Sequence, residues 1–231
     1  MSLTKNKIPV ITIDGPSGAG KGAISQLLAS KLGFHLLDSG ALYRVTAVAA
    51  AQQALDLKDI SQVAEVARNL AVSFSVASGR VIVKLNGDDV TREIRRQTVD
   101  IAASMIAAQY AVREALLARQ RAFQRPPGLV ADGRDMGTTV FPDAELKIFL
   151  TADVEQRAQR RYKQLIDKGE SVNLAALLEE IKARDERDSR RSTSPLLADA
   201  DAIEIDSTQM SIDQVLAAIL AQVHSRQLLV N

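Results

Sequence analysis

A strand-forming run that breaks into a glycine-rich loop is the feature that most constrains this chain. Residues 10–14 read Val-Ile-Thr-Ile-Asp, and residues 15–22 read Gly-Pro-Ser-Gly-Ala-Gly-Lys-Gly. Glycines let backbone N–H groups approach phosphate oxygens closely, Lys21 adds a positive charge, and the following helix offers its N-terminus. The pattern GxxxxGK, with Gly15 and Gly20 before Lys21, therefore predicts a phosphate-binding loop.

The context of the loop supports this interpretation. Apolar residues at helical spacing follow it, and Gly33 closes the run of Ile24, Leu27, Leu28 and Leu32. A fortuitous glycine turn is the alternative, and the combination of strand, loop, lysine and amphipathic helix disfavours it. The hydroxyl residue that normally follows the lysine and binds Mg²⁺ is replaced by Gly22, with Ala23 after it.

Composition excludes several classes of protein. The chain has 231 residues, enough for one domain with appendages or two small ones, and its net charge of +1 gives no overall field that would recruit nucleic acid or an anionic membrane. Absent cysteines exclude disulfides and thiolate zinc sites. The N-terminus is short and polar, and no run of about 18 apolar residues occurs. We expect a soluble, cytoplasmic protein, and a monomer because no interface patch stands out.

Five apolar segments predict buried parallel strands of an α/β fold, because stretches with helical periodicity separate them. They are residues 8–13, 34–37, 128–131, 146–150 and 202–206. Ser211 with Gln214 three residues later predicts a capping box that opens a final helix.

About 90 residues lie between the second and third strands, more than one crossover helix needs, which predicts an inserted subdomain. Residues 72–76 and 81–85 read as short strands around Ser78-Gly79, and a third strand at Val90 follows Asn86-Gly87, so we expect an antiparallel meander.

Two polar clusters follow predicted strands, where α/β sheets place ligand groups. The first cluster, from Asp38 to Arg44, offers two hydroxyls, of Ser39 and Tyr43, and one guanidinium as possible ligand groups. The alternative is a helix cap with a solvated arginine. The second cluster, Asp132-Gly133-Arg134-Asp135, offers two carboxylates and an arginine as possible ligand groups. The alternative is a turn with a surface ion pair. Asp132 is the natural carboxylate for the water shell of a metal, and Arg134 and Asp135 could face a second substrate.

Two arginine groups lie on predicted helices. Arg157, Arg160 and Arg161 fall within about one and a half turns that lead to a Lys168-Gly169 stop, and Arg184, Arg187 and Arg191 share one face with Asp188 among them. A solvated helix with salt bridges is the alternative for each group. With a phosphate loop present, both groups favour phosphoryl transfer to a phosphorylated acceptor, which needs cations on several sides.

The chain resembles the bacterial-type cytidylate kinases, which phosphorylate CMP and dCMP. The resemblance covers essentially the whole chain, and four motifs in the family's order carry it: IDGPSGAGKG at 13–22, LLDSGALYR at 36–44, ADGRDMGTTVFPDA at 131–144 and RDERDSRR at 184–191. One departure is Ala23, where the family usually has Thr or Ser after Lys-Gly.

The resemblance implies a P-loop NTPase core at residues 1–41 and 116–231, with a five-stranded parallel sheet flanked by helices. It also implies an NMP-binding subdomain at 42–115, whose meander spans about 72–90, and a short lid near 155–172.

The resemblance implies direct in-line transfer from magnesium-ATP to CMP or dCMP. The ATP phosphates would be bound by the loop residues Gly15, Pro16, Ser17, Gly18, Ala19, Gly20, Lys21, Gly22 and Ala23, and by Arg157 and Arg161 of the lid. The acceptor phosphate would be bound by Arg44, Arg134 and Arg184, with Arg191 nearby, and its sugar side by Ser39, Tyr43 and Asp188. Cytosine would be read by Ser104, Arg113 and Asp135, and Mg²⁺ would be held by Asp132 through water.

Three other functions compete with this interpretation. A GTP-dependent switch would need DxxG and NKxD segments, and the sequence has neither. A kinase for a non-nucleotide acceptor stays open, as does a non-catalytic nucleotide-binding module, against which Lys21, Asp132 and the arginines argue.

Overall fold

The computed structural model describes residues 7–77, 80–167 and 169–228. The predicted turn at Ser78-Gly79 and the predicted stop at Lys168 lie outside these residues. The chain forms two compact units, here called unit 1 (residues 1–37 and 121–231) and unit 2 (residues 38–120).

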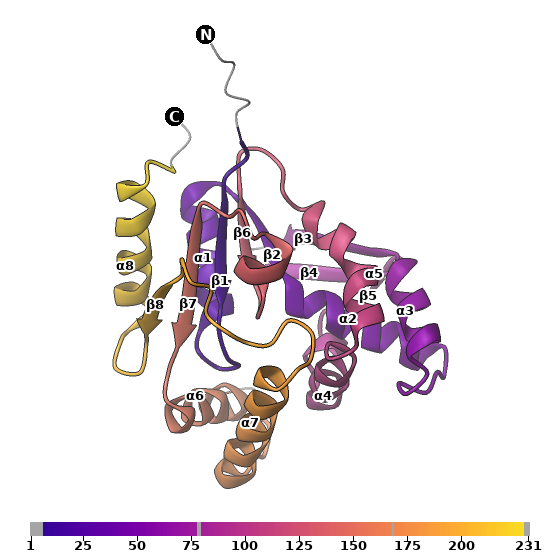
Figure 1. The fold of residues 1–231 in the computed structure, drawn as a ribbon. Helices are drawn as coiled ribbons and strands as arrows, with labels where there is room; N and C mark the ends of the chain where they lie inside the picture. Colours follow the sequence, from indigo (N-terminus) through magenta and orange to yellow (C-terminus); the bar gives the residue numbers. More distant parts are fainter. Residues whose placement is uncertain (1–6, 78–79, 168, 229–231) are drawn as a thin grey trace. The chain divides into compact units, whose positions relative to one another are not determined.

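Unit 1 is built on a five-stranded sheet with the order β2-β6-β1-β7-β8 (Figure 1). Strand pairs β1/β6, β1/β7 and β7/β8 are parallel. The five predicted strands are confirmed, each within two residues of its predicted bounds: β1 (Val10–Asp14), β2 (His35–Asp38), β6 (Leu129–Asp132), β7 (Leu146–Thr151) and β8 (Ile203–Asp206).

The position of β1 explains its continuous apolar sequence. All five of its residues are buried, because the strand lies between β6 and β7 and helices cover the sheet. In the register of the sheet, Ile13 pairs with Asp132 of β6, and Asp14 pairs with Phe149 of β7. The loops after β1 and β6 therefore begin side by side at one edge.

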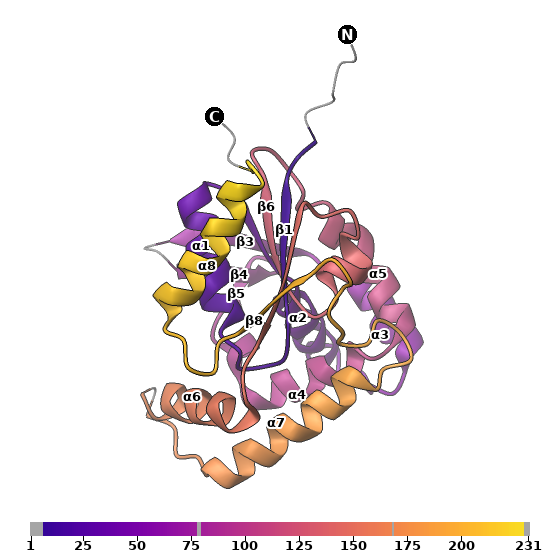
Figure 2. The same ribbon diagram turned by 60° about the vertical axis from the view of Figure 1, so that its left-hand side comes forward.

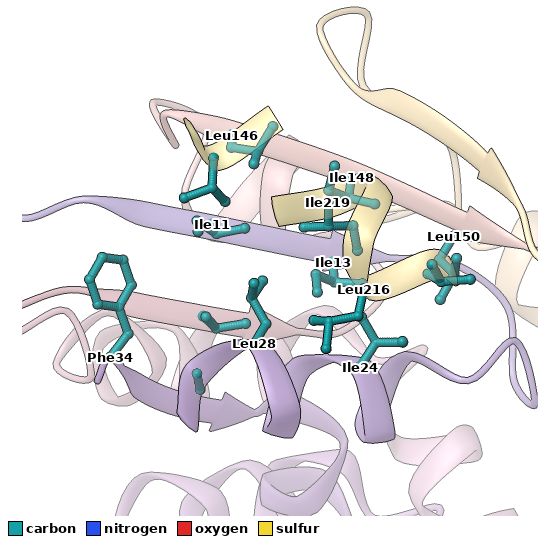
Figure 3. Packing of buried hydrophobic residues seen from close by; sticks show 14 of the residues in the cluster. Ile11, Ile13, Ile24, Leu28, Phe34, Leu146, Ile148, Leu150, Leu216 and Ile219 are labelled. Atoms are coloured by element: carbon teal, nitrogen blue, oxygen red, sulfur yellow. The ribbon is translucent and has the colours of Figure 1, made fainter. Parts of the chain in front are cut away.

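Helices α1 (Lys21–Leu32) and α8 (Ile212–Ser225) pack against each other and against the sheet (Figure 2). Their apolar side chains meet those of β1 and β7 in one cluster, in which Ile11, Leu28 and Ile219 are fully buried (Figure 3). Each such side chain stabilises the fold by about 1.5–3 kcal/mol relative to exposure. The predicted capping box is confirmed, because the side chains of Ser211 and Gln214 each bond the other's backbone N–H.

Unit 1 also contains α6 (Val154–Ile166) and α7 (Leu174–Ser189), which pack against each other (Figure 2). A short π-helix, η2 (Met136–Val140), follows β6. The predicted lid at 155–172 includes most of α6, and its function as a lid stays a prediction.

Unit 2 contains a three-stranded sheet with the order β3-β4-β5, and its strand pairs are antiparallel. The predicted meander is confirmed, with its third strand two residues earlier than Val90. The elements are α2 (Ser39–Gln52), α3 (Ile60–Arg68), β3 (Val72–Ala77), β4 (Arg80–Leu85), β5 (Asp88–Asp89), η1 (Glu93–Arg95), α4 (Gln97–Ile106) and α5 (Tyr110–Arg121).

The core of unit 2 forms between α2 and the small sheet. Val45 and Val48 of α2 pack with Val83 and Leu85 of β4, and all four are buried. Among the described residues, no single helix is long and apolar enough to cross a membrane. Helices α4 and α5 reach that length and apolar composition only when they are counted together, and a bend of 101° separates them.

Candidate active site

The glycine-rich loop starts where β1 meets its neighbour β7. Gly15 has a φ of 144°, and a Cβ atom at this position would lie 1.9 Å from the carbonyl oxygen of Leu150. No other residue fits there without moving β7. Only glycine therefore lets the chain leave the sheet at this point and turn into the loop.

The loop ends at the start of α1. Gly20, with a φ of 97°, is the N-cap residue of the helix, and it has no side chain to occupy the helix end. Gly22 and Ala23 in the first turn are exposed. The N-terminal N–H groups of α1 have no partners within the helix, so this end favours an anion such as a phosphate.

Lys21 is buried, and its Nζ donates to the carbonyl oxygen of Pro16 at 2.7 Å. Burial lowers the pKa of Lys21 to about 7, with further lowering by the positive charges of Arg134 and Arg184 and opposition from Asp132. The ammonium is thus held inside the loop at an electrostatic cost. A bound phosphate would offset that cost by supplying negative charge.

Asp132 ends β6 next to the loop and is nearly buried. Its Oδ2 lies 3.5 Å from the position that a Cβ atom of Gly22 would take. No group of three His, Cys, Asp or Glu residues that could hold a metal by itself occurs within the described residues. A Mg²⁺ ion commonly takes one or two carboxylates together with substrate phosphates, and Asp132 beside the phosphate loop fits that arrangement.

A buried carboxylate holds two of the predicted arginines together. Asp188 of α7 accepts from Arg134 Nε at 3.0 Å through Oδ2, and its Oδ1 lies 2.8 Å from Nη2 of Arg191. The side chains of Asp188 and Arg191 are 5% and 4% exposed. Two guanidinium groups from different segments are therefore fixed close together by one anion.

The charge of Asp188 is maintained by these arginines. Burial acts to raise the pKa of its carboxyl, but the positive charges of Arg134, Arg191 and Arg184 outweigh burial and lower the pKa below its ordinary value. Arg184 also interacts electrostatically with Lys21. Three predicted acceptor-phosphate arginines and the loop lysine thus form one positively charged region of unit 1.

Arg157 of α6 makes three contacts with the protein itself. Its guanidinium donates to the carbonyl oxygens of Ala152 and Ser17, at 2.8 and 3.0 Å, and to Asp185 Oδ2 at 2.6 Å. In this structure Arg157 therefore holds the phosphate loop to α6 and α7. Its predicted contact with ATP stays a prediction, as does that of Arg161, which is partly buried on the same helix.

Sequence reasoning missed a second support of the loop. Ser207, which follows β8 and is buried, donates to the carbonyl oxygens of Ala19 and Thr151. Arg160 in turn donates to the carbonyl oxygen of Ser207 at 2.6 Å. A serine after an edge strand carries no sequence signal of this role, because the contact joins residues 188 positions apart.

In unit 2, Asp38 and Arg44 form a local pair at the start of α2. The carboxylate of Asp38 accepts from the N–H of Ala41 and from Arg44 Nη2, at 2.8 and 2.9 Å. Arg44 Nη1 also lies 3.8 Å from Asp100 of α4. The helix-cap alternative is thus correct for Asp38, while its arginine is ion-paired rather than solvated.

The remaining predicted residues of unit 2 are buried. Ser39 Oγ donates to Gln120 Oε1 at 2.8 Å, and the guanidinium of Arg113 lies 5.9 Å from the ring centroid of Tyr43. Ser104 Oγ is buried and has no hydrogen-bond partner within the described part of the chain. Burial of Ser104 and Arg113 argues against the solvated role that helical spacing alone suggests.

Comparison with known proteins decides the family. The family model "Cytidylate kinase" matches residues 11–225. The chain belongs to the cytidylate kinase family. A cytidylate kinase from Aeromonas salmonicida (strain A449) is 61% identical over 92% of this chain and 93% of its own length, and one from Stutzerimonas stutzeri (strain A1501) is 57% identical over 96% and 97%.

A much lower sequence identity is found with one solved structure. A gluconokinase from Sinorhizobium meliloti 1021 is 13% identical, covers 96% of this chain and 99% of its own, and has a TM-score of 0.45. Membership of the cytidylate kinase family confirms the resemblance and the predicted class, a nucleotide-binding phosphotransferase with a P-loop.

Proposed function

We propose that this cytidylate kinase family member transfers the γ-phosphoryl group of ATP directly to CMP or dCMP, giving ADP and CDP or dCDP. The observation that supports it best is the buried pairing of Arg134 and Arg191 through Asp188, beside Lys21. A hydrolase would need fewer cations, because only one phosphorylated substrate has to be neutralised.

The donor phosphates are assigned to the loop from Gly15 to Ala23. Its N–H groups and the N-terminus of α1 would bind the oxygens, and Lys21 would place its charge at the β- and γ-phosphates. Asp132 would hold Mg²⁺ through water. When bound, Mg²⁺ would neutralise part of the charge on the phosphates during transfer.

The acceptor phosphate is assigned to Arg134, Arg184 and Arg191 of unit 1 and to Arg44 of unit 2. A guanidinium suits this task because its planar fork matches two phosphate oxygens at once. Asp188 fixes the two neighbouring guanidiniums before substrate arrives, so less of the binding free energy is spent on ordering them. Ser39, Tyr43 and Asp188 are assigned to the sugar side.

Cytosine is assigned to Asp135 of unit 1 and to Ser104 and Arg113 of unit 2. The amino group of cytosine donates to a carboxylate, while its ring nitrogen and carbonyl accept from donors such as arginine. Uracil has a carbonyl in place of the amine, so a carboxylate there disfavours UMP. The buried Oγ of Ser104 supports this role, because buried hydroxyls normally have a partner.

A general base is not needed. The acceptor phosphate is already ionised near neutral pH, and catalysis then rests on positioning and electrostatic stabilisation. Arg157 and Arg161 of the predicted lid at 155–172 would act on the ATP side. We further propose that the enzyme works as a monomer in the cytoplasm.

Turnover with a panel of acceptors tests the proposal. Purified protein is incubated with magnesium-ATP and each of CMP, dCMP, UMP, AMP, GMP and shikimate, and ADP formation is followed. We expect CMP and dCMP to be clearly preferred. Preference for shikimate would instead support a kinase of a non-nucleotide acceptor, and ATP binding without any turnover would support a non-catalytic module.

A further inference from the structure

One buried carboxylate has no role in the mechanism above. Asp14 ends β1 directly before Gly15 of the phosphate loop, and it is only 6% exposed. Its Oδ1 accepts from the N–H of Met136, and its Oδ2 accepts from the N–H of Gly137, each at 2.8 Å. Both oxygens of this side chain are thus used to hold the start of η2.

The opposite end of η2 is held by a cation. Arg121 donates from Nε to the carbonyl oxygen of Val140 at 3.0 Å and from Nη2 to that of Thr139 at 3.3 Å. An anion at the N–H end and a cation at the carbonyl end both match the dipole of a helical turn. The short π-helix is therefore fixed from both ends by side chains outside it.

Close packing also restrains residues 132–140. A Cβ atom on Gly137 would lie 2.9 Å from Thr12 Oγ1, and one on Gly133 would lie 2.8 Å from the side chain of Met136. Gly137 thus packs closely onto β1, and Gly133 packs closely onto Met136 within residues 132–140, which carry Asp132, Arg134 and Asp135. Hereafter residues 132–140 are called the 132–140 segment.

Asp14 interacts electrostatically with Asp135 and Lys21, two residues of the proposed site. Burial raises the pKa of Asp14 to about 7, although the N–H groups of Gly137 and Met136 lower it, and Asp135 and Lys21 act on it in opposite directions. Burying a carboxylate in such a place is costly, and the two backbone hydrogen bonds offset part of that cost.

From this geometry we infer that Asp14 is a positioning residue that fixes the 132–140 segment relative to the phosphate loop, and so sets cytosine selectivity through Asp135. The inference rests on the proposed function. Because Asp14 is continuous with Gly15, one side chain joins the ATP-binding loop to the segment assigned to acceptor recognition. A shift of about 1 Å in such a segment is enough to lower turnover substantially.

The Asp14→Asn variant tests this directly. An asparagine has one carbonyl oxygen to accept one N–H, while its NH₂ group opposes the other. We expect the ratio of kcat/KM for CMP over UMP to fall about tenfold, as expected for loss of one charge-assisted hydrogen bond. Asp59→Asn is the matched control, because Asp59 also accepts a backbone N–H but is a partly exposed cap of α3, and the ratio for this variant should not change.

A second variant covers the case in which Asp14→Asn does not fold. Arg121→Met releases the other end of η2 at an exposed position and should lower the same ratio by a smaller factor, about threefold. Arg125→Met, at another exposed position nearby in the sequence, is its control. An unchanged CMP over UMP ratio in folded Asp14→Asn, or in Arg121→Met if the first variant does not fold, would overturn the inference.

Hydrogen exchange separates this inference from the proposed function. In Asp14→Asn, the N–H groups of Met136 and Gly137 should exchange faster than in the wild type, while those of α8 should not. If the wild type does not prefer CMP, the proposed function fails, and the exchange of these two groups alone decides whether Asp14 holds the segment. Unchanged exchange in the folded variant would reject the inference whatever the activity.

Discussion

The cations assigned to phosphate in unit 1 and the Ser104 hydroxyl assigned to the base in unit 2 are prepared in different ways. Lys21 donates to the carbonyl oxygen of Pro16, and Arg134 and Arg191 are paired through Asp188. Ser104 in unit 2 keeps a buried Oγ with no hydrogen-bond partner within the described residues. The cations are held by other groups of the protein, whereas within the described residues the Ser104 hydroxyl makes no hydrogen bond that binding of a ligand would have to break.

The difference follows from the cost of burying each group. Guanidinium and ammonium groups cannot be buried close together without anions, so the fold supplies Asp188, Asp132 and backbone carbonyls. A hydroxyl without a partner costs only about 1–3 kcal/mol. Substitutions in the phosphate region should therefore change both folding and turnover, and a substitution of Ser104 should change CMP recognition alone.

The largest effect is expected for Lys21→Met. Removal of this charge leaves the positively charged region without the group assigned to the β- and γ-phosphates, and kcat should fall on the order of 10³-fold. Steady-state turnover with CMP measures the fall. Lys31→Met, on an exposed residue of the last turn of the same helix, should retain full activity. A fall of less than tenfold in Lys21→Met would contradict the assignment.

Asp188→Asn should come next and should affect both properties. Loss of the anion between Arg134 and Arg191 should lower kcat/KM for CMP about 10²-fold and the free energy of unfolding at pH 7 by about 3 kcal/mol. Urea unfolding and steady-state kinetics measure the two. Glu186→Gln, which changes an exposed pair with Arg190, is the control.

The pH dependence of stability gives an independent check on Asp188. The pKa of its carboxyl is lowered in the folded state, so its contribution to stability is fully present above its ordinary value of 3.8 and is lost as the pH falls through the lower folded-state pKa. Asp188→Asn should therefore lose less stability than the wild type as the pH falls below about 4. An equal loss in both proteins would mean that Asp188 is not held by the arginines as described.

Ser104→Ala should separate recognition from folding. Truncation of a buried hydroxyl without a partner should leave the free energy of unfolding unchanged or raise it by up to about 1 kcal/mol. The KM for CMP should rise about threefold to tenfold while the KM for ATP stays the same. Ser25→Ala is a closely matched control, because Ser25 Oγ in α1 is likewise buried with no hydrogen-bond partner in the described part of the chain, and neither KM should change.

The parts of the molecule that were predictable from sequence are those whose cause is local. Buried strands, the capping box at Ser211 and the loop from Gly15 to Lys21 each follow from residues a few positions apart. The supports of the site do not. Asp14 meets the N–H of Gly137 across 123 positions, and Ser207 meets Ala19 across 188. Such contacts depend on strand order, which spacing along the chain does not encode.

The helix positions of the site show the same limit. Asp188 stands among arginines at helical spacing, a pattern that equally fits a solvated face with salt bridges. Only the fold brings Arg134, 54 positions away, to the other oxygen of its carboxylate. For Ser104 and Arg113, the sequence alone favoured solvated positions, and the resemblance to a family rather than periodicity singled them out.

The smallest effect is expected for Ala23→Thr, which restores the hydroxyl that the family usually has after Lys-Gly. Ala23 is exposed in the first turn of α1, so a threonine there meets no packing conflict, although its β-branch slightly lowers helix propensity. An added hydroxyl at the phosphate end should lower the KM for ATP by up to about threefold, with kcat for CMP nearly unchanged. Ala23→Val has the same branching without the hydroxyl and should not lower the KM. An equal decrease in both variants would show that shape rather than a hydrogen bond is responsible.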